Sequence, residues 1–283
     1  MKVSRRRFLQ MLGGTMAAGG VAAATGYHYA AFIEPERLIH QQQVIPLPGL
    51  HSSLEGFRLV QLSDFHYNDN KNTLTYLQHV VSQTNLLQPD LIVLTGDFVD
   101  SNLDGLPELM ETLAELKARW GVYAVLGNHD HRRGASAVRY GLEEVGIKLL
   151  WNENVTLSGD AAALSLIGLD DWLRGRPQIR PAVDGLPSHT TNILLVHEPD
   201  VADIICRYPQ FHLQLSGHTH GGQIRLPILG PLILPVLGQK YDQGYYQVEG
   251  LHLYTSRGVG TLSDVPFRFN CPPELTELIL ARG

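Results

Sequence analysis

Apolar and polar positions alternate along the first half of the chain in a way that predicts strands separated by helices. Three short apolar runs have the length of buried strands and end in polar residues: 57–64, 90–97 and 121–130. Residues 72–88, 106–120 and about 135–145 have apolar positions at helical spacing, and Pro107 lies near a helix start, where proline is tolerated. Such alternation is typical of an α/β domain with a parallel sheet.

The second half of the chain is richer in strand patterns. These patterns cover residues 163–171, 191–200, 211–220, 245–250, 251–256 and 275–280. Residues 31–44 are expected to be a connector, because residues 31–55 contain three prolines and show no sustained hydrophobic period. No later linker divides the chain, so the sequence predicts one domain over residues 45–283.

Residues 1–30 have the pattern of an export signal. Lys2, Arg5, Arg6 and Arg7 precede residues 8–33, which contain no Asp, Glu, Lys or Arg and are rich in alanine and glycine. The sequence SRRRFLQ resembles a twin-arginine signal, which predicts export by the twin-arginine machinery to the periplasm or cell envelope. The segment is either cleaved or kept as a membrane anchor, and both alternatives stay open here.

Composition excludes some classes of protein. The 283 residues are 44% hydrophobic and carry a net charge of −6, which would become −10 if residues 1–30 and their four positive charges were removed. Nucleic-acid binding is therefore not expected, because nucleic-acid-binding domains are usually basic. Two cysteines, Cys206 and Cys271, are too few for a disulfide scaffold. A disulfide between them is one alternative, and we favour the other, two buried thiols.

Polar residues gather at the C-terminal ends of the predicted strands, the edge where α/β proteins build ligand sites. They are Asp64, His66, Asp97, Asn128, His129, Asp130, His197, His218 and His220. In an extended chain, side chains two residues apart point the same way, so each of the pairs 64/66 and 218/220 can present two groups to one place. Leaving His129 and Asp130 aside, the other seven residues make a set of oxygen and imidazole ligands. That set suits two Mn, Fe or Zn ions if one carboxylate bridges them.

Five short sequences contain these residues in chain order: SDFHY, LTGDFVD, LGNHD, LLVHEPD and SGHTHGGQ. Together they resemble the motif blocks of the calcineurin-like metallophosphoesterase family, over residues 64–223. The sequences GQIRLP and RFNCPPEL resemble its twin-arginine-exported bacterial branch of YkuE- and YaeI-type phosphodiesterases. The resemblance implies a four-layer α/β/β/α sandwich with its metal site at the strand C-terminal ends.

The resemblance also implies roles for these residues. One divalent ion would be held by Asp64, His66, Asp97 and His220, and the other by Asp97 as a bridge with Asn128, His197 and His218. A hydroxide bridging the two ions would hydrolyse a phosphodiester or phosphomonoester. His129 would stabilise the developing charge or protonate the leaving group, and Asp130 would orient His129.

Two other functions stay open. The chain is alternatively a pyrophosphatase acting on UDP-diacylglucosamine-type lipid intermediates. One branch with that activity has arginine at the position of His129, which counts against close kinship with it. The other alternative is a non-catalytic protein that binds metal or the cell wall, and the complete set of predicted ligands opposes this interpretation.

Substrate contacts are less well indicated by the sequence. Arg132, Arg133, Arg225 and Arg257 either bind phosphate or lie in solvated loops. Residues 226–238, LPILGPLILPVLG, are apolar and uncharged and closely follow the last predicted ligands. They form either a buried loop or an apolar lip that contacts acyl chains or the membrane surface. The second alternative fits a lipid-linked phosphate ester as substrate.

Overall fold

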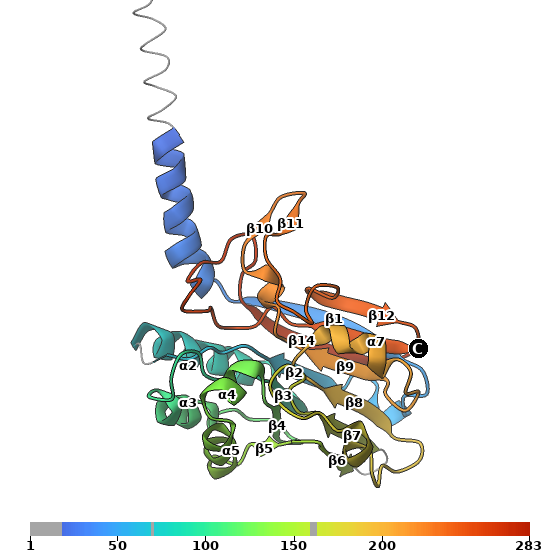
Figure 1. Ribbon diagram of the computed structural model, residues 1–283. Coiled ribbons are helices and arrows are strands. Elements are labelled where there is room, and N and C mark those ends of the chain that lie inside the picture. Colours follow the sequence, from blue (N-terminus) through green and yellow to red (C-terminus); the bar gives the residue numbers. More distant parts are fainter. Residues whose placement is uncertain (1–18, 69–70, 159–162) are drawn as a thin grey trace, which may run out of the picture.

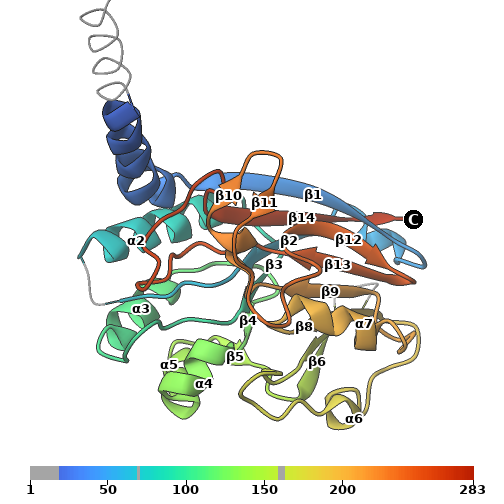
Figure 2. The ribbon, with the colours of Figure 1, turned by 45° about the horizontal axis from the view of Figure 1, so that its top comes forward.

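Two six-stranded sheets lie face to face, with helices on their outer faces (Figures 1 and 2). The computed structural model describes residues 19–68, 71–158 and 163–283. The first sheet contains, in spatial order, β1 (Ile39–Leu47), β14 (Glu274–Arg282), β2 (Arg58–Leu62), β3 (Leu91–Thr95), β4 (Val122–Val125) and β5 (Lys148–Leu149). Strands β2 to β5 are parallel, as the alternation with helices predicted.

The helices that connect these parallel strands cover the outer face of the first sheet. They are α2 (Lys71–Leu86), α3 (Leu106–Leu113), α4 (Asn128–Arg133) and α5 (Ala135–Glu144). Helix α3 is shorter than the expected 106–120. Residues 128–130, expected at the end of a strand, instead begin the additional helix α4.

The second sheet also has a parallel centre. Its spatial order is β12 (Gly244–Val248), β13 (Leu251–Thr255), β9 (Leu213–Ser216), β8 (Thr191–Leu195), β7 (Ala163–Gly168) and β6 (Glu153–Ser158). The outer strands β12 and β6 run antiparallel to their neighbours. Short helices lie beside this sheet: α6 (Ile179–Ala182), α7 (Ala202–Ile205) and the 3-10 turn η4 (Pro199–Val201). Strands β10 (Arg225–Leu226) and β11 (Gly230–Pro231) form a separate hairpin.

Three apolar layers account for this architecture. In β3, Leu91 and Val93 face the second sheet, whereas Ile92 and Leu94 face helices α2, α3 and α5. This division follows from the two-residue period of a strand, because a strand buried on both faces needs apolar residues throughout. In the second sheet a third cluster packs against α7. The chain is therefore the expected α/β/β/α sandwich.

The expectation that residues 31–44 form a connector is corrected by the structure. Residues 39–47 form β1, which pairs in parallel with β14 along its whole length. Glu34 is buried and its carboxylate accepts a hydrogen bond from the backbone N–H of Cys271. The folded unit thus begins before residue 45. Local sequence did not indicate this, because the strand's partner lies more than 200 residues later in the chain.

The chain enters the domain through a helical segment. Residues 19–28 are helical and continue into the π turn η1 (Tyr29–Ile33) and the 3-10 turn η2 (Glu34–Glu36). The sequence SRRRFLQ lies outside the described residues. Among the residues that are described, no helix combines the length and the apolar character needed to cross a membrane.

The pairing of β1 predicts a contrast between two adjacent side chains. Ile45 is fully buried between the sheets, whereas Val44 is 49% exposed. We expect Ile45→Ala to lower the free energy of unfolding by about 2–4 kcal/mol, because it leaves a cavity in the core. Val44→Ala, the matched control, should change it by less than about 0.5 kcal/mol. Urea denaturation measures both, and equal effects would show that β1 does not belong to the folded core.

Candidate metal centre

All seven predicted ligands follow the C-terminal ends of strands, and Asn128 is also the first residue of α4. Asp64 and His66 follow β2, Asp97 follows β3, and Asn128 follows β4 in the first sheet. From the second sheet come His197 after β8, and His218 and His220 after β9. Because the two sheets pack face to face, these loops meet at one edge of the sandwich, where ligand sites of α/β proteins are expected.

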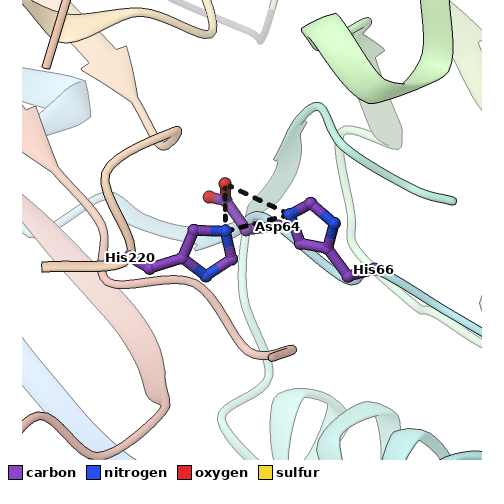
Figure 3. Close-up of side chains that lie close together, drawn as sticks. All are labelled: Asp64, His66 and His220. Carbon is purple, nitrogen blue, oxygen red and sulfur yellow. Dashed lines mark hydrogen bonds and ion pairs between the residues drawn. The ribbon is translucent and has the colours of Figure 1, made fainter. Parts of the chain in front are cut away.

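Asp64, His66 and His220 form one buried cluster (Figure 3). The Nε2 atoms of the two histidines are 2.9 Å apart, and Asp64 Oδ1 lies 3.4 Å from His220 Nε2. Figure 3 shows the carboxylate and both imidazole rings pointing toward one another, Asp64 and His66 from the segment after β2 and His220 from the segment after β9. The three donor atoms are close enough to bind a single cation.

Asp64, Asp97 and His197 form a second buried cluster beside the first. Asp97 Oδ2 lies 3.1 Å from His197 Nε2 and 3.4 Å from His66 Nε2, so it lies between the two groups of histidines. The ring of His218 lies 5.0 Å from that of His197, whereas the ring of His220 lies 4.7 Å from that of His66. The two histidines of the HTH sequence therefore lie beside different clusters.

Backbone contacts orient the imidazole rings. His197 Nδ1 donates to the carbonyl of Thr95 at 2.7 Å, which leaves its Nε2 lone pair facing Asp97. His218 Nε2 donates to the carbonyl of Val236 at 2.9 Å, which leaves the lone pair of Nδ1 to bind a metal. Outer partners of this kind fix the tautomer of metal-binding histidines.

The donor atoms fit a pair of divalent cations. Within the described part of the chain, His197 Nε2 and Asn128 Oδ1 are buried polar atoms without a hydrogen-bond partner. A buried polar atom left unsatisfied is costly unless it has another partner, and a cation is such a partner. The donors are carboxylate, amide and imidazole groups, which suit Mn²⁺, Fe²⁺ or Zn²⁺. The two buried Asp/His clusters are thus consistent with a dimetal site.

Burial controls protonation in these clusters. Burial and the neighbouring His197 lower the pKa of His218 to about 4, and burial beside His66 holds the pKa of His220 well below its usual value. Burial opposes ionisation of Asp97, but His197 and His66 outweigh it and hold its pKa well below the usual range. His218 and His220 are thus neutral and Asp97 is ionised, which are the protonation states that bind metal. Burial opposes protonation of His197 and His66, but nearby carboxylates outweigh it and raise the pKa of both, so these two imidazoles would release a proton when metal binds.

The ligand loops have unusual backbone conformations. Five predicted ligands have positive φ angles, between 41° and 73°: Asp64, His66, Asp97, His218 and His220. Their convergence therefore does not arise from extended chain, as we had reasoned from the two-residue spacing. Such conformations cost about 1–3 kcal/mol each, and they are concentrated at functional sites.

The expected role of Asp130 as the partner of His129 is corrected by the structure. Its buried carboxylate accepts hydrogen bonds from the backbone N–H groups of Asp97, Phe98, Val99 and Gly127. These bonds tie the loop after β3 to the loop after β4. Asp130 thus shapes the backbone around the metal ligands and does not hold the imidazole of His129.

Asp100 takes the place that we had assigned to Asp130. His129 Nδ1 donates to the Asp100 carbonyl at 3.3 Å and lies 3.7 Å from its carboxylate, which also lies 3.3 Å from His66 Nδ1. Burial opposes ionisation of Asp100, but hydrogen bonds from His66 and Ser263 lower its pKa to about 2. The sequence did contain a signal, because Asp100 is the second aspartate of the motif LTGDFVD.

Arg268 is a second residue that sequence reasoning missed. Its guanidinium is fully buried and donates to the carbonyls of Arg257, Gly260 and Cys271. One of its nitrogens also lies 3.4 Å from His220 Nδ1. It therefore supports the loop behind His220. Only the fold indicates this role, because arginine side chains are seldom buried and Arg268 lies 48 residues from His220 in the sequence.

The four arginines expected to contact substrate do not line the cavity at the centre. A cavity of about 280 Å³ opens at the clusters and is lined by His66, Asp97, His129, His218 and His220. Its apolar rim is formed by Ile224, Leu232, Ile233, Pro235, Leu262 and Val265. None of the four arginines belongs to this described lining. Arg225 is paired with Asp242 and Arg257 with Glu274, Arg133 donates to the Asp100 carbonyl, and Arg132 is exposed.

The two cysteines are free thiols. Cys271 is buried and its Sγ donates to the carbonyl of His220 at 3.2 Å, whereas Cys206 is partly exposed at the C-terminal end of α7. The favoured alternative of unpaired thiols agrees with this geometry for Cys271, although Cys206 is less buried than expected.

Comparison with known proteins identifies relatives across the whole chain. The sequence model described as calcineurin-like phosphoesterase matches residues 57–222. The uncharacterized metallophosphoesterase YkuE of Bacillus subtilis is 39% identical over 99% of this chain and 98% of its own, and the phosphodiesterase YaeI of Escherichia coli is 31% identical over 98% and 99%. The 5′-nucleotidase precursor of Thermus thermophilus superposes with a TM-score of 0.50 at 12% identity, over 80% of this chain and 54% of its own, and shares the fold.

The contacts of the two aspartates predict different defects. Asp130→Asn should lower the free energy of unfolding by about 3 kcal/mol, because the amide cannot accept all four backbone bonds. Asp100→Asn should unfold near the wild-type midpoint but bind metal about 10–100-fold more weakly, because His66 loses its outer carboxylate. Urea denaturation and titration with Mn²⁺ measure the two effects. The assignment fails if the two variants show the reverse pattern.

Proposed function

This chain belongs to the calcineurin-like metallophosphoesterase family, and from that premise we propose that it is an exported phosphodiesterase with two divalent ions. The observation that supports the reaction most directly is the meeting of seven predicted ligands from both sheets, five of which line one cavity. The relative named as a phosphodiesterase supports a diester as substrate, and a phosphomonoester is the alternative.

Asp64, His66, Asp97 and His220 would hold one ion, and Asp97, Asn128, His197 and His218 would hold the other. When bound, two ions of Mn, Fe or Zn would supply Lewis acidity toward the phosphate and lower the pKa of bound water. The protein's own part is to hold these donors in a buried, preorganised arrangement. Asp97, located between the two histidine groups, is the residue best placed to serve both ions.

His129 would act on the leaving group. In hydrolysis the water oxygen forms a new bond to phosphorus, the ester P–O bond breaks, and the leaving alkoxide takes up a proton. His129 lines the cavity, and its Nδ1 donates to the carbonyl of Asp100. That contact leaves Nε2 as the nitrogen that can stabilise the leaving oxygen or give it a proton. Asp100 positions His129, and Asp130 acts one step further away through the backbone.

Export would follow from the N-terminal sequence. The arginine pair before Phe8 and Leu9, and the uncharged residues 8–33, support transport by the twin-arginine machinery into the periplasm or cell envelope. This machinery carries folded proteins, so the metal centre could be assembled before transport. Cleavage of the signal and retention as an anchor are both compatible with this proposal.

The proposed roles of two residues predict separate losses. His129→Ala should keep bound metal but lower kcat on a phosphodiester with an alkoxide leaving group by about 10²–10⁴-fold, because that leaving group loses its proton source. Asp97→Ala should lose both metal and turnover. Turnover with Mn²⁺ and metal content by mass spectrometry measure the two variants, with exposed His189→Ala as the matched control. Full activity in His129→Ala, or wild-type turnover that survives a chelator, would refute the proposal.

The export proposal predicts dependence on the arginine pair. Arg5→Lys combined with Arg6→Lys should leave the folded protein in the cytoplasm, because the twin-arginine machinery reads the guanidinium pair. Lys2→Gln removes a charge but keeps the pair, so this control should still be exported. Fractionation of cells followed by immunoblotting measures the distribution. Normal export of the double variant would exclude this route.

A further inference from the structure

An aliphatic loop projects beside the metal centre. This loop, residues 224–238, contains the hairpin β10–β11, and its uncharged stretch begins at residue 226. Its exposed fractions are unusually large: Ile228 106%, Leu229 78%, Leu232 55%, Ile233 81% and Val236 64%. The expectation of a buried loop is therefore wrong for these side chains. Soluble proteins seldom expose so many neighbouring aliphatic groups without a partner for them.

The aliphatic loop is joined to the predicted ligands. Leu232, Ile233 and Pro235 line the same cavity as His218 and His220. The Val236 carbonyl accepts the hydrogen bond from His218, and Pro231 packs so closely on Gly222 that a Cβ there would overlap it. A molecule that covers the loop would thus also reach the mouth of the cavity. The apolar surface and the reaction site form one continuous surface.

Charges at the base of the aliphatic loop are already neutralised. Arg225 donates to the carboxylate of Asp242 and to the carbonyl of Gly221. Just beyond the loop, Lys240 is paired with Asp203. The projecting part has neither free charge nor an aromatic or arginine side chain, which are the groups enriched at protein–protein hot spots. This chemistry favours a hydrocarbon environment over a protein partner.

The N-terminal segment leaves the domain on the same side. In both Figure 1 and Figure 2 the N-terminal helix and the β10–β11 hairpin rise from the same end of the sandwich. Tyr27, Phe32 and Ile33 are 46–60% exposed there, and the Ala30 carbonyl accepts a hydrogen bond from the Arg268 backbone. Within the described part of the chain, the uncharged residues 19–33 thus meet the domain on the face where the loop projects.

We propose that the aliphatic loop inserts into the surface of a lipid bilayer and that the preferred substrates are phosphodiesters with long hydrocarbon chains. The phosphate would enter the cavity while the hydrocarbon stays against the loop and the outer lipid leaflet. The proposal rests on the proposed phosphodiesterase function and adds the class of substrate. Aliphatic side chains with no adjacent free charge are suited to the acyl boundary of a membrane.

The docking part is tested on the full chain with vesicles of equal parts phosphatidylethanolamine and phosphatidylglycerol. Leu229→Cys, combined with Cys206→Ser, is labelled with an environment-sensitive nitrobenzoxadiazole dye. Leu86→Cys is the matched control, because Leu86 is 71% exposed on α2, away from the loop. We expect a blue shift and stronger emission at 229 and none at 86. An unchanged spectrum at 229, or equal shifts at both positions, would overturn docking by the loop, even if the N-terminal segment binds vesicles.

The substrate part is tested with two diesters that share one leaving group, methyl p-nitrophenyl phosphate and hexadecyl p-nitrophenyl phosphate in the same vesicles. Ile228→Ser with Leu229→Ser should lower kcat/KM on the hexadecyl ester at least about tenfold, because two large aliphatic groups leave the lipid contact. The methyl ester should stay within about twofold, since neither residue lines the cavity. Leu86→Ser is the control.

The outcomes separate the two proposals. No metal-dependent turnover of the methyl ester by the wild type would refute the phosphodiesterase function itself. Normal turnover of the methyl ester with no preference for the hexadecyl ester, or an equal loss on both esters in the double variant, would overturn only the lipid inference. Self-association of the wild type that disappears in the double variant, without any binding to vesicles, would assign the loop to a second copy and also overturn it.

Discussion

The apolar layer between the two sheets is the constraint on which the rest of the molecule depends. This layer is one continuous cluster of buried apolar side chains. It includes Ile45, Leu91 and Val93 from one sheet and Leu166, Ile193 and Leu215 from the other. This layer determines how the C-terminal ends of β2, β3 and β4 face those of β8 and β9. Since the predicted ligands come from both sets of strands, neither sheet alone could form the metal centre.

A centre built this way lowers the stability of the folded chain, and the structure shows which contacts offset this loss. Buried carboxylates, an unpartnered imidazole nitrogen and five residues with positive φ all oppose folding in the absence of metal. The four backbone bonds to Asp130 and the buried donors of Arg268 hold the loops in place on either side. Metal binding would supply the remaining stabilisation, because ions that bind only the native state favour it.

The sequence predicted the parallel strands and the polar residues that follow them at one edge of the sandwich, because the period of apolar residues and the polar residues at strand ends are local features. It did not reveal β1, whose partner β14 lies at the other end of the chain. The roles of Asp100 and Asp130 were not predicted correctly either. Which carboxylate reaches His129 depends on how the loop after β3 folds against α4, and spacing alone does not determine this.

The turn that contains His218 and His220 links binding of metal to recognition of substrate. Its backbone bends through left-handed conformations at 218, 220, 221 and 222, which turns His218 toward His197 and His220 toward His66. The same turn packs on Pro231 and, through His218, contacts the Val236 carbonyl. A shift of the aliphatic loop would therefore be transmitted to a predicted ligand by one hydrogen bond. Contact of this loop with a hydrocarbon surface would restrain the loop and His218 at the same time. The geometry of the centre and the preference for an apolar substrate would then depend on the same few residues.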